Sequence, residues 1–375
     1  MPEFKLPPVS PLAGTTLVNY LRVLKGNPIH PRHWLKTILT LIIILIATPF
    51  HWYERLRFKG QVKRFKFKEE PLFILGHWRS GTTYLHNVLC EDPKAGFMTT
   101  YHALWPHNLF SKAIFRTFMS IAMPKKRPSD NVELRVDFPQ EDEFCIGNVV
   151  PHFHYLFWYF PNKWREHYDQ YVRFNNVPIQ LKEKWNEAYY AMIVKSLIDT
   201  KGERAVFKNP SNTARIKTLL EIFPEARFIH IHRNPIVVYL STKKFFLELY
   251  PTLTFQPVSE AEITEMVFEN YENVMREFLE QRSLIPSENF IEICFEDFEK
   301  APMDYLANLY DRLKLPGFET AKPYFQAYVD SMNTYKKNKY YTIKKWELDR
   351  ILKDWEFTMK EWGYEVPQNL IIEDN

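Results

Sequence analysis

Glycine and cysteine are scarce in this sequence, which has 10 glycines and 3 cysteines among 375 residues. So few glycines argue against collagen-like repeats and flexible linkers, and the sequence contains no internal repeat or low-complexity tract. Cys90, Cys145 and Cys294 are far apart, odd in number and without metal-ligand spacing. They are therefore interpreted as buried free thiols in a reducing compartment. The sequence also lacks an Asn-x-Ser/Thr acceptor with x other than proline, which disfavours a glycosylated lumenal protein.

The composition is that of a globular chain, 46% hydrophobic and 25% charged, which can form one large domain or two small ones. Charge is distributed unevenly along it. Residues 1–70 contain 12 lysines and arginines against 4 acidic residues, whereas the remainder contains 37 against 41. No nucleic-acid-binding motif accompanies these basic residues, so we expect no nucleic-acid partner.

Short apolar runs alternate with helical periodicity through the middle of the chain. This alternation predicts a parallel sheet covered by helices on both faces, a three-layer α/β/α sandwich. The predicted strands are 71–75, 204–208, 226–232 and 289–295, and the predicted helices are 82–89, 213–223, 262–283 and 343–362.

The point at which this strand–helix pattern begins suggests the domain organisation. Residues 1–67 are predicted to form a basic helical appendage, and residues 68–375 the main α/β domain. The aromatic-rich region 101–185 lacks the strand–helix rhythm, so we interpret it as an insertion that forms the acceptor side of a site.

The loop after the first predicted strand reads GHWRSGTT, from Gly76 to Thr83. Its G-x-x-x-x-G frame is that of a P-loop, which surrounds an anion with backbone N–H groups at a helix N-terminus. The Walker lysine is absent because Thr82 occupies its position. Arg79 can supply a positive charge instead, so the loop fits an anion held without the usual lysine-and-magnesium grip. A plain glycine turn that caps a helix is the alternative interpretation.

A second candidate anion site follows the strand ARFIHIH at residues 226–232. Arg233 comes directly after it, at the carboxyl end of a parallel strand, where open α/β sheets bind ligands. A guanidinium there can bind a phosphate with two N–H groups. Pro235 suits the first turn of the next helix, and Ser241 lies about two turns further on. A structural salt bridge of Arg233 is the alternative.

These stretches carry a family resemblance. FILGHWRSGTTYLH and FPEARFIHIHRNPIVVYLS resemble the 5′-phosphosulfate loop and the 3′-phosphate motif of sulfotransferases, most of all the large bacterial family related to tyrosylprotein sulfotransferases. PQEDEF, FKNPSNTARI and YKKNKY extend the similarity over about residues 71–340. The resemblance implies a P-loop-like fold and 3′-phosphoadenosine 5′-phosphosulfate as the sulfuryl donor.

The resemblance also implies which residues bind this donor. The 5′-phosphosulfate would be held by the loop, and the 3′-phosphate by Arg233 and Ser241. A late basic loop of cytosolic members suggests Lys336 and Lys337 as further 3′-phosphate ligands. The residues implied for the 5′-phosphosulfate are Arg79, Ser80, Gly81, Thr82 and Thr83.

The catalytic base is less clear from the sequence. Tyrosine-modifying members have a glutamate about twenty residues after the loop arginine, where this chain reads MTTYH at residues 98–102. That departure disfavours peptide-tyrosine sulfation. Glu141 and Glu143 are the preferred candidates, since they would share one face if the segment were extended, and His102 is the alternative. Lys208, at the end of a predicted strand, could reach the sulfuryl oxygens, and Arg79 would stabilise the leaving phosphate.

No metal is predicted. The pairs His230-x-His232 and His152-x-His154 have no third ligand at a useful spacing, and sulfuryl transfer can proceed with arginine and backbone donors alone. The expected acceptor is a small or lipid-like molecule. Two other functions stay open: a P-loop nucleotide kinase or NTPase, and a non-catalytic, membrane-bound nucleotide-binding module.

Residues 37–53 form the longest run without a full charge. As a helix this run would be about 25 Å long, slightly short of the roughly 30 Å hydrocarbon core. Pro49 is predicted to kink or end the helix before Tyr53. We therefore expect a helix embedded in, or lying on, the cytoplasmic face of a membrane, in a cytoplasmic protein without a cleaved signal peptide. Burial in the protein's own core or in a homo-oligomer interface is the alternative.

Overall fold

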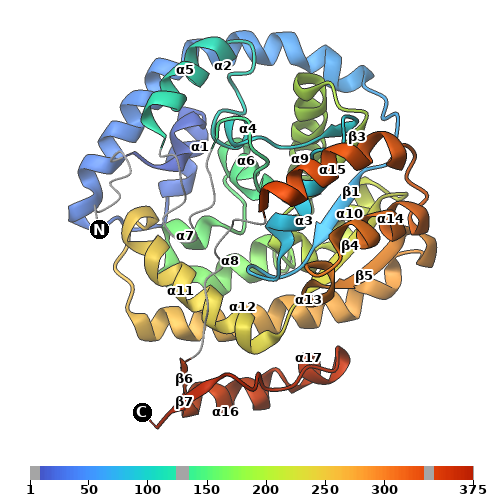
Figure 1. Ribbon diagram of the computed structural model, residues 1–375. Coiled ribbons are helices and arrows are strands. Elements are labelled where there is room, and N and C mark those ends of the chain that lie inside the picture. Colours follow the sequence, from blue (N-terminus) through green and yellow to red (C-terminus); the bar gives the residue numbers. More distant parts are fainter. Residues whose placement is uncertain (1–8, 124–134, 333–341, 375) are drawn as a thin grey trace. The chain divides into compact units, whose positions relative to one another are not determined.

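The computed structural model describes residues 9–123, 135–332 and 342–374, and it divides into two compact units whose elements are labelled in Figure 1. Unit 1 comprises Met1–Pro71, Lys94–Lys208 and Leu249–Val258. Unit 2 comprises Leu72–Pro93, Asn209–Glu248 and Ser259–Asn375. The N-terminal segment and the predicted insertion 101–185 therefore belong to the same unit.

Unit 2 contains a parallel ladder of three strands. β4 (Arg227–His232) lies between β1 (Leu72–Leu75) and β5 (Phe290–Cys294) and pairs in parallel with both. Every residue of β1 is buried, as expected for a strand covered on both faces. The described part of unit 2 also contains seven α-helices outside the small C-terminal sheet region, and the last residues of one of them, α11 (Pro235–Leu253), belong to unit 1. The others are α3 (Thr82–Leu89), α10 (Ile216–Ile222), α12 (Glu260–Gln281), α13 (Phe295–Phe298), α14 (Pro302–Arg312) and α15 (Phe318–Met332).

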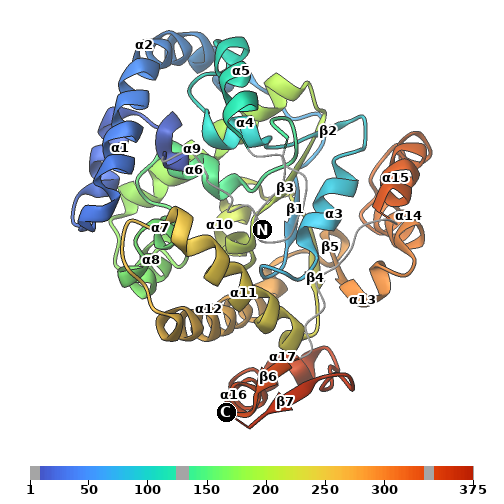
Figure 2. The same cartoon turned by 60° about the vertical axis from the view of Figure 1, so that its left-hand side comes forward.

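The C-terminal part of unit 2 has its own small sheet. β6 (Thr342–Lys344) pairs in parallel with β7 (Ile371–Glu373), and between them lie α16 (Lys345–Asp354) and α17 (Glu356–Glu361). These elements are visible at the red end of the chain in Figure 2.

Unit 1 is mainly helical. Its strands β2 (Ala95–Gly96) and β3 (Arg204–Lys208) pair in parallel, and β3 is buried throughout. Between residues 101 and 185 the described residues form helices and no named strand. The helices of unit 1 are α1 (Leu17–Leu24), α2 (Trp34–Arg64), α4 (Thr100–Leu104), α5 (Lys112–Ala122), α6 (Asp142–Val149), α7 (Leu156–Tyr159), α8 (Trp164–Tyr171) and α9 (Ile179–Thr200).

The predicted parallel α/β fold is confirmed, and the four predicted strands match β1, β3, β4 and β5 to within one residue at each end. Two helix predictions need correction. The segment 343–362 begins in strand β6, and its helix is interrupted at Trp355, which is buried. The segment 213–223 begins as a 3-10 turn (Pro210–Ala214) before α10, because Pro210 and the side chain of Asn209 favour a turn.

Of the two outcomes predicted for Pro49, a kink or an end of the helix, the end was wrong. Helix α2 continues through this proline to Arg64. A proline removes one backbone hydrogen bond, but contacts on both sides of it can hold the helix together. Lys36 and Thr40 precede the proline and His51 and Glu54 follow it, and all four side chains are buried against unit 1.

The turn between β1 and α3 depends on glycine at two positions. Gly76 has φ 146°, and a Cβ there would lie 2.5 Å from the Ile231 carbonyl oxygen of the neighbouring strand. Gly81 has φ 93°, and its Cβ would lie 2.0 Å from the Phe295 ring. Left-handed φ and close packing together restrict both positions to glycine.

Gly81→Ala should therefore lower the free energy of unfolding more than Gly363→Ala. Gly363 also has positive φ but nothing within 4 Å of an added Cβ. The Gly363→Ala variant therefore measures the cost of the left-handed backbone alone, which is about 1–2 kcal/mol of the free energy of unfolding. Overpacking at Phe295 should add about 1–3 kcal/mol at Gly81. Urea unfolding of both variants measures the difference, and equal losses would contradict this account of the turn.

Candidate functional site

The loop that follows β1 is a compact turn built from its own backbone and one neighbouring side chain. The Gly76 amide donates to the Thr213 hydroxyl at 2.8 Å, and the Ser80 amide donates to the His77 carbonyl at 3.2 Å. Arg79 adopts a left-handed φ of 70°, uncommon for a residue with a side chain. Such strain is concentrated at functional sites, because it persists only where the surroundings fix the conformation.

Arg79, Arg233 and Ser241 meet at this loop, as their motifs predict. The Arg79 Nε donates to the Ser241 hydroxyl at 2.8 Å. The Arg233 Nη1 donates to the Arg79 carbonyl oxygen at 3.3 Å. Two guanidinium side chains from residues 154 positions apart are thus brought together at the carboxyl ends of β1 and β4, where parallel sheets bind their ligands.

Aromatic rings position both arginines. The Arg233 guanidinium lies 4.6 Å from the centroid of the Phe295 ring, and that of Arg79 lies 5.8 Å from Phe245. Cation–π contact favours a flat guanidinium over a lysine ammonium, and the planar guanidinium matches the geometry of a phosphate. Chemically, the arrangement can bind two anionic groups of one ligand.

The remaining loop residues lie next to these arginines in sequence. Ser80 and Thr82 are buried, Thr83 is half-buried, and Gly81 is the N-cap residue of α3. Lys336 and Lys337 lie outside the described residues. The local fold follows from sequence here, because a buried strand, a glycine turn and a helix N-terminus bring successive side chains to one place.

The acidic string lies in unit 1, at the start of helix α6. Glu141 is the N-cap residue, and Asp142 and Glu143 are in the first turn. Acidic residues there interact favourably with the helix dipole, which explains why the segment is helical. Because the segment is helical from Asp142, the shared face that an extended segment would give Glu141 and Glu143 does not arise.

Glu141 is the acid that contacts a second predicted residue. Its carboxylate accepts a hydrogen bond from Lys208 and another from the Tyr155 hydroxyl. Lys208 is the last residue of β3 and is 2% exposed. The buried Lys208 ammonium thus pairs with the Glu141 carboxylate as an ion pair.

Asp142 and Glu143 have structural contacts. Asp142 accepts a hydrogen bond from the Tyr189 hydroxyl, and Glu143 accepts one from the backbone amide of His154. Both side chains are fully buried. These bonds join α6 to α9 and to the segment before α7.

His102 lies in the capping box of helix α4. Its Nδ1 accepts a hydrogen bond from the Thr99 amide at 3.2 Å, and its Nε2 lies 2.8 Å from the Asp199 carboxylate. Burial lowers the pKa of His102. Burial alone would raise the pKa of Asp199, but hydrogen bonds from His102 and Lys112 hold it at about 2. Both imidazole nitrogens thus have partners that stabilise local structure.

The histidine pairs have aromatic and carboxylate neighbours. His230 Nδ1 lies 2.7 Å from Glu292, and its ring stacks on Phe278. His232 stacks on Trp362 at 4.8 Å between ring centroids. Within residues 9–123, 135–332 and 342–374, no three His, Cys, Asp or Glu residues are grouped as metal ligands would be.

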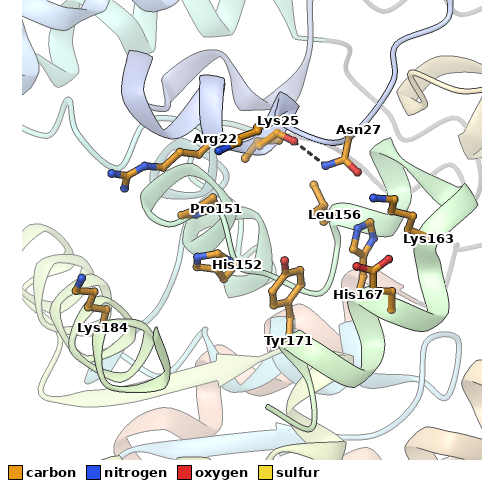
Figure 3. A pocket seen from close by; sticks show the side chains of 12 residues that line it. Arg22, Lys25, Asn27, Pro151, His152, Leu156, Lys163, His167, Tyr171 and Lys184 are labelled. Carbon is orange, nitrogen blue, oxygen red and sulfur yellow. Dashed lines mark hydrogen bonds between the residues drawn. The ribbon is translucent and has the colours of Figure 1, made fainter. Parts of the chain in front are cut away.

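A separate cavity of about 480 Å³ lies within unit 1. Figure 3 shows the side chains that line it. Burial lowers the pKa of His167 to about 3, so its ring is neutral at pH 7. The cavity therefore has a net positive lining, which favours an anionic group, and it contains none of the predicted site residues. Its charged lining residues are Arg22, Lys25, Lys163, Lys184 and Glu166.

Sequence reasoning missed three partners of the site residues. Thr213 lies within the quoted stretch FKNPSNTARI, so that motif could have drawn attention to it. Tyr155 contacts Glu141 from 14 positions away, and Asp199 contacts His102 from 97 positions away. No local sequence pattern predicts either contact.

Comparison with known proteins identifies one family. The model of the sulfotransferase family matches residues 71–320 of this chain. The omega-hydroxy-beta-dihydromenaquinone-9 sulfotransferases Stf3 of Mycobacterium bovis and Mycobacterium tuberculosis are each 31% identical over 331 residues. That alignment covers 87% of this chain and 84% of each relative.

Two solved structures share the fold. Sulfotransferase STF9 of Mycobacterium avium superimposes with a TM-score of 0.65, covering 96% of this chain and 98% of that one. Sulfotransferase STF1 of Mycobacterium tuberculosis gives a TM-score of 0.64, covering 92% and 90%. Both are 16% identical to this chain, so the likeness concerns the fold alone.

Glu141→Gln should lower turnover by roughly 10²–10⁴, the usual contribution of a general base, while leaving donor affinity nearly unchanged. His102→Ala should instead lower the melting temperature, because it removes one hydrogen bond of the α4 capping box and a partner of Asp199. Steady-state rates and thermal melts of the two variants separate these roles. A turnover loss of this size in His102→Ala, with Glu141→Gln fully active, would make His102 the base.

Proposed function

Because the chain belongs to the sulfotransferase family, we propose that it transfers the sulfuryl group of 3′-phosphoadenosine 5′-phosphosulfate to a hydroxyl group of a lipid-like acceptor. The observation that carries the donor assignment is the meeting of Arg79, Ser241 and Arg233 at one glycine turn. The three free cysteines fit a reducing, cytoplasmic compartment, where this donor would be met.

The two anionic groups of the donor suit the two arginines. We assign the 5′-phosphosulfate to the loop of Arg79, Ser80, Gly81, Thr82 and Thr83 at the N-terminus of α3, and the 3′-phosphate to Arg233 and Ser241. Each guanidinium can make two N–H bonds to a phosphate. Arg79 would also neutralise the charge that develops on the leaving phosphate oxygen.

The reaction forms one bond and breaks one. The acceptor oxygen bonds to sulfur, the bond between sulfur and the bridging phosphate oxygen breaks, and the electron pair leaves with that oxygen. The acceptor proton must be removed, and Glu141 is the proposed base. Lys208, which donates to Glu141, supplies the positive charge proposed for the sulfuryl oxygens. No step requires a metal ion, although the reaction has the same need for in-line positioning as phosphoryl transfer.

Two observations favour a lipid-like acceptor. The mycobacterial relatives act on a hydroxylated menaquinone derivative, as their name states, and they align with most of this chain. Helix α2 also exposes large apolar side chains, among them Trp52 and Leu56, which are 76% and 79% exposed. An enzyme with an apolar surface of this kind can reach an acceptor that resides in a membrane.

3′-Phosphoadenosine 5′-phosphate should raise the melting temperature of the protein by ligand linkage, and ATP at equal concentration should raise it much less. Arg79→Ala and Arg233→Ala should each abolish most of this shift, because each leaves a phosphate without its charged donor. Thermal melts with both nucleotides make the comparison. Equal stabilisation by ATP would overturn the donor assignment and favour a nucleotide kinase or NTPase.

Incubation with donor and a lipid extract should give a sulfated product that mass spectrometry detects, whereas water-soluble phenols and sugars should give little sulfated product.

The transfer rate should stay within about twofold in excess EDTA, because Arg79 and Lys208 are proposed to neutralise the charge that metals neutralise in phosphoryl transfer. A large loss that magnesium restores would contradict the proposed mechanism. Donor binding with no transfer to any pool would instead indicate a binding module.

A further inference from the structure

Helix α2 exposes a row of large apolar side chains along one side. At about 100° per residue, nine large apolar residues fall within an arc of roughly 120° along the whole helix. All nine are among the exposed hydrophobic residues of the chain. We call this set the outer arc; it consists of Trp34, Leu35, Ile38, Ile42, Leu45, Ile46, Trp52, Tyr53 and Leu56.

The opposite side of α2 faces the protein and contains four buried polar residues beside Ile44 and Ala47. Lys36 donates to the carbonyl oxygens of Thr252 and Leu253 at 2.8 and 2.7 Å, in the last turn of α11. The Ser10 amide donates to the Thr40 hydroxyl at 2.9 Å. Burial lowers the pKa of Lys36 to about 8. These contacts fix the start of α2 to unit 1.

The second half of α2 is fixed in the same way. His51 Nε2 lies 3.0 Å from the Asn108 side-chain oxygen, and Glu54 accepts a hydrogen bond from Lys195 of α9. Glu54 is 1% exposed. In an ordinary surface helix the apolar stripe faces the core and the polar residues face water. Helix α2 departs from this arrangement, because it buries Lys36, Thr40, His51 and Glu54 and exposes the outer arc.

The apolar surface extends onto the neighbouring helices, which lie beside α2 in both ribbon views (Figures 1 and 2). Tyr53 of the outer arc packs on Phe110, with ring centroids 4.4 Å apart, and Phe110 is itself 53% exposed. Ile114 and Phe118 of α5 are exposed one turn apart on one side of that helix. Helix α1, which packs on α2, exposes Val18 and Leu21.

Positive charge surrounds this surface. The last ten residues of α2, 55–64, contain five exposed basic residues and no acidic one. Arg57 is one of them, and its guanidinium lies 5.1 Å from the Phe110 ring centroid. Arg22 and Lys25, at the end of α1, are also exposed. Basic residues beside an apolar helix face are complementary to the anionic surface of a bilayer.

We propose that unit 1 binds an anionic lipid bilayer through the outer arc of α2, flanked by the exposed apolar residues of α1 and α5. Trp34 and Trp52, near the two ends of the arc, suit the headgroup level where aromatic rings concentrate. The helix lies in the plane of the membrane surface. Membrane binding itself does not depend on the proposed function. Only its consequence, the access of the enzyme to a lipid acceptor, rests on that function.

An in-plane position follows from the buried polar contacts. The outer arc is about 33 Å long, long enough to span a bilayer of about 30 Å. Spanning would place Lys36, Glu54 and their protein partners within the hydrocarbon, where charged groups are costly. An in-plane helix keeps these contacts and immerses only the arc.

Flotation of the full-length protein with vesicles tests the proposal without any turnover. The protein should float with vesicles of 70% phosphatidylcholine and 30% phosphatidylglycerol, and less with phosphatidylcholine alone. Ile42→Glu with Ile46→Glu should abolish flotation, because it places two charges on the outer arc. Leu284→Glu, at a residue of unit 2 that is 51% exposed, is the matched control and should float like the wild type. Thermal melts check that all variants remain folded.

The contribution of charge is measured separately. Lys59→Gln with Lys63→Gln should weaken binding to the anionic vesicles by about fivefold per removed charge. Carbonate extraction should release the wild-type protein from membranes, and retention would show that α2 spans the bilayer, against the proposal. A wild-type protein that stays with the soluble fraction would also overturn it. A dimer that Ile42→Glu with Ile46→Glu converts to a monomer would then assign the outer arc to a second copy.

Failure here is distinguishable from failure of the proposed function. The thermal shift by 3′-phosphoadenosine 5′-phosphate depends on residues of unit 2 and requires no membrane. The variant Ile42→Glu with Ile46→Glu should keep that shift whether or not the membrane proposal holds.

Discussion

The left-handed backbone at Arg79, held between two glycines, is the constraint on which the donor assignment depends. It directs the Arg79 side chain to Ser241 on α11 and its carbonyl oxygen to Arg233 at the end of β4. Three segments of unit 2 are thereby fixed around one loop. Two basic residues that contact one loop favour an anionic ligand there, which is why the proposed donor is assigned to it.

The buried carboxylates of unit 1 differ in their partners. At the start of α6, Glu141 accepts hydrogen bonds from a buried lysine and a tyrosine hydroxyl, and it is the residue proposed as the base. Asp142, Glu143 and Asp199 accept bonds that hold helices and caps in place. Burial alone does not separate these roles, since all four are mostly buried; the identity of the partners does.

The strands, the donor loop and the helix after it follow closely from sequence, because each depends on neighbouring residues. Buried strands appear as short apolar runs, and GHWRSGTT places a glycine turn directly before a helix. The Glu141 site was predicted only in part, because Tyr155 and Lys208 lie 14 and 67 positions away. The sequence left the conformation of the acidic string open, and the structure places Asp142 and Glu143 in the first turn of a helix, where they interact favourably with its dipole.

Helix α2 shows most clearly what the sequence determined and what only the tertiary structure decided. The sequence by itself determined that residues 37–53 form an apolar run with basic flanks. It could not determine which residues of the helix face the protein, and the usual preference would bury the large apolar ones. The tertiary structure placed Lys36, His51 and Glu54 against unit 1, because their hydrogen-bonding groups find partners there, and it left many large apolar side chains exposed.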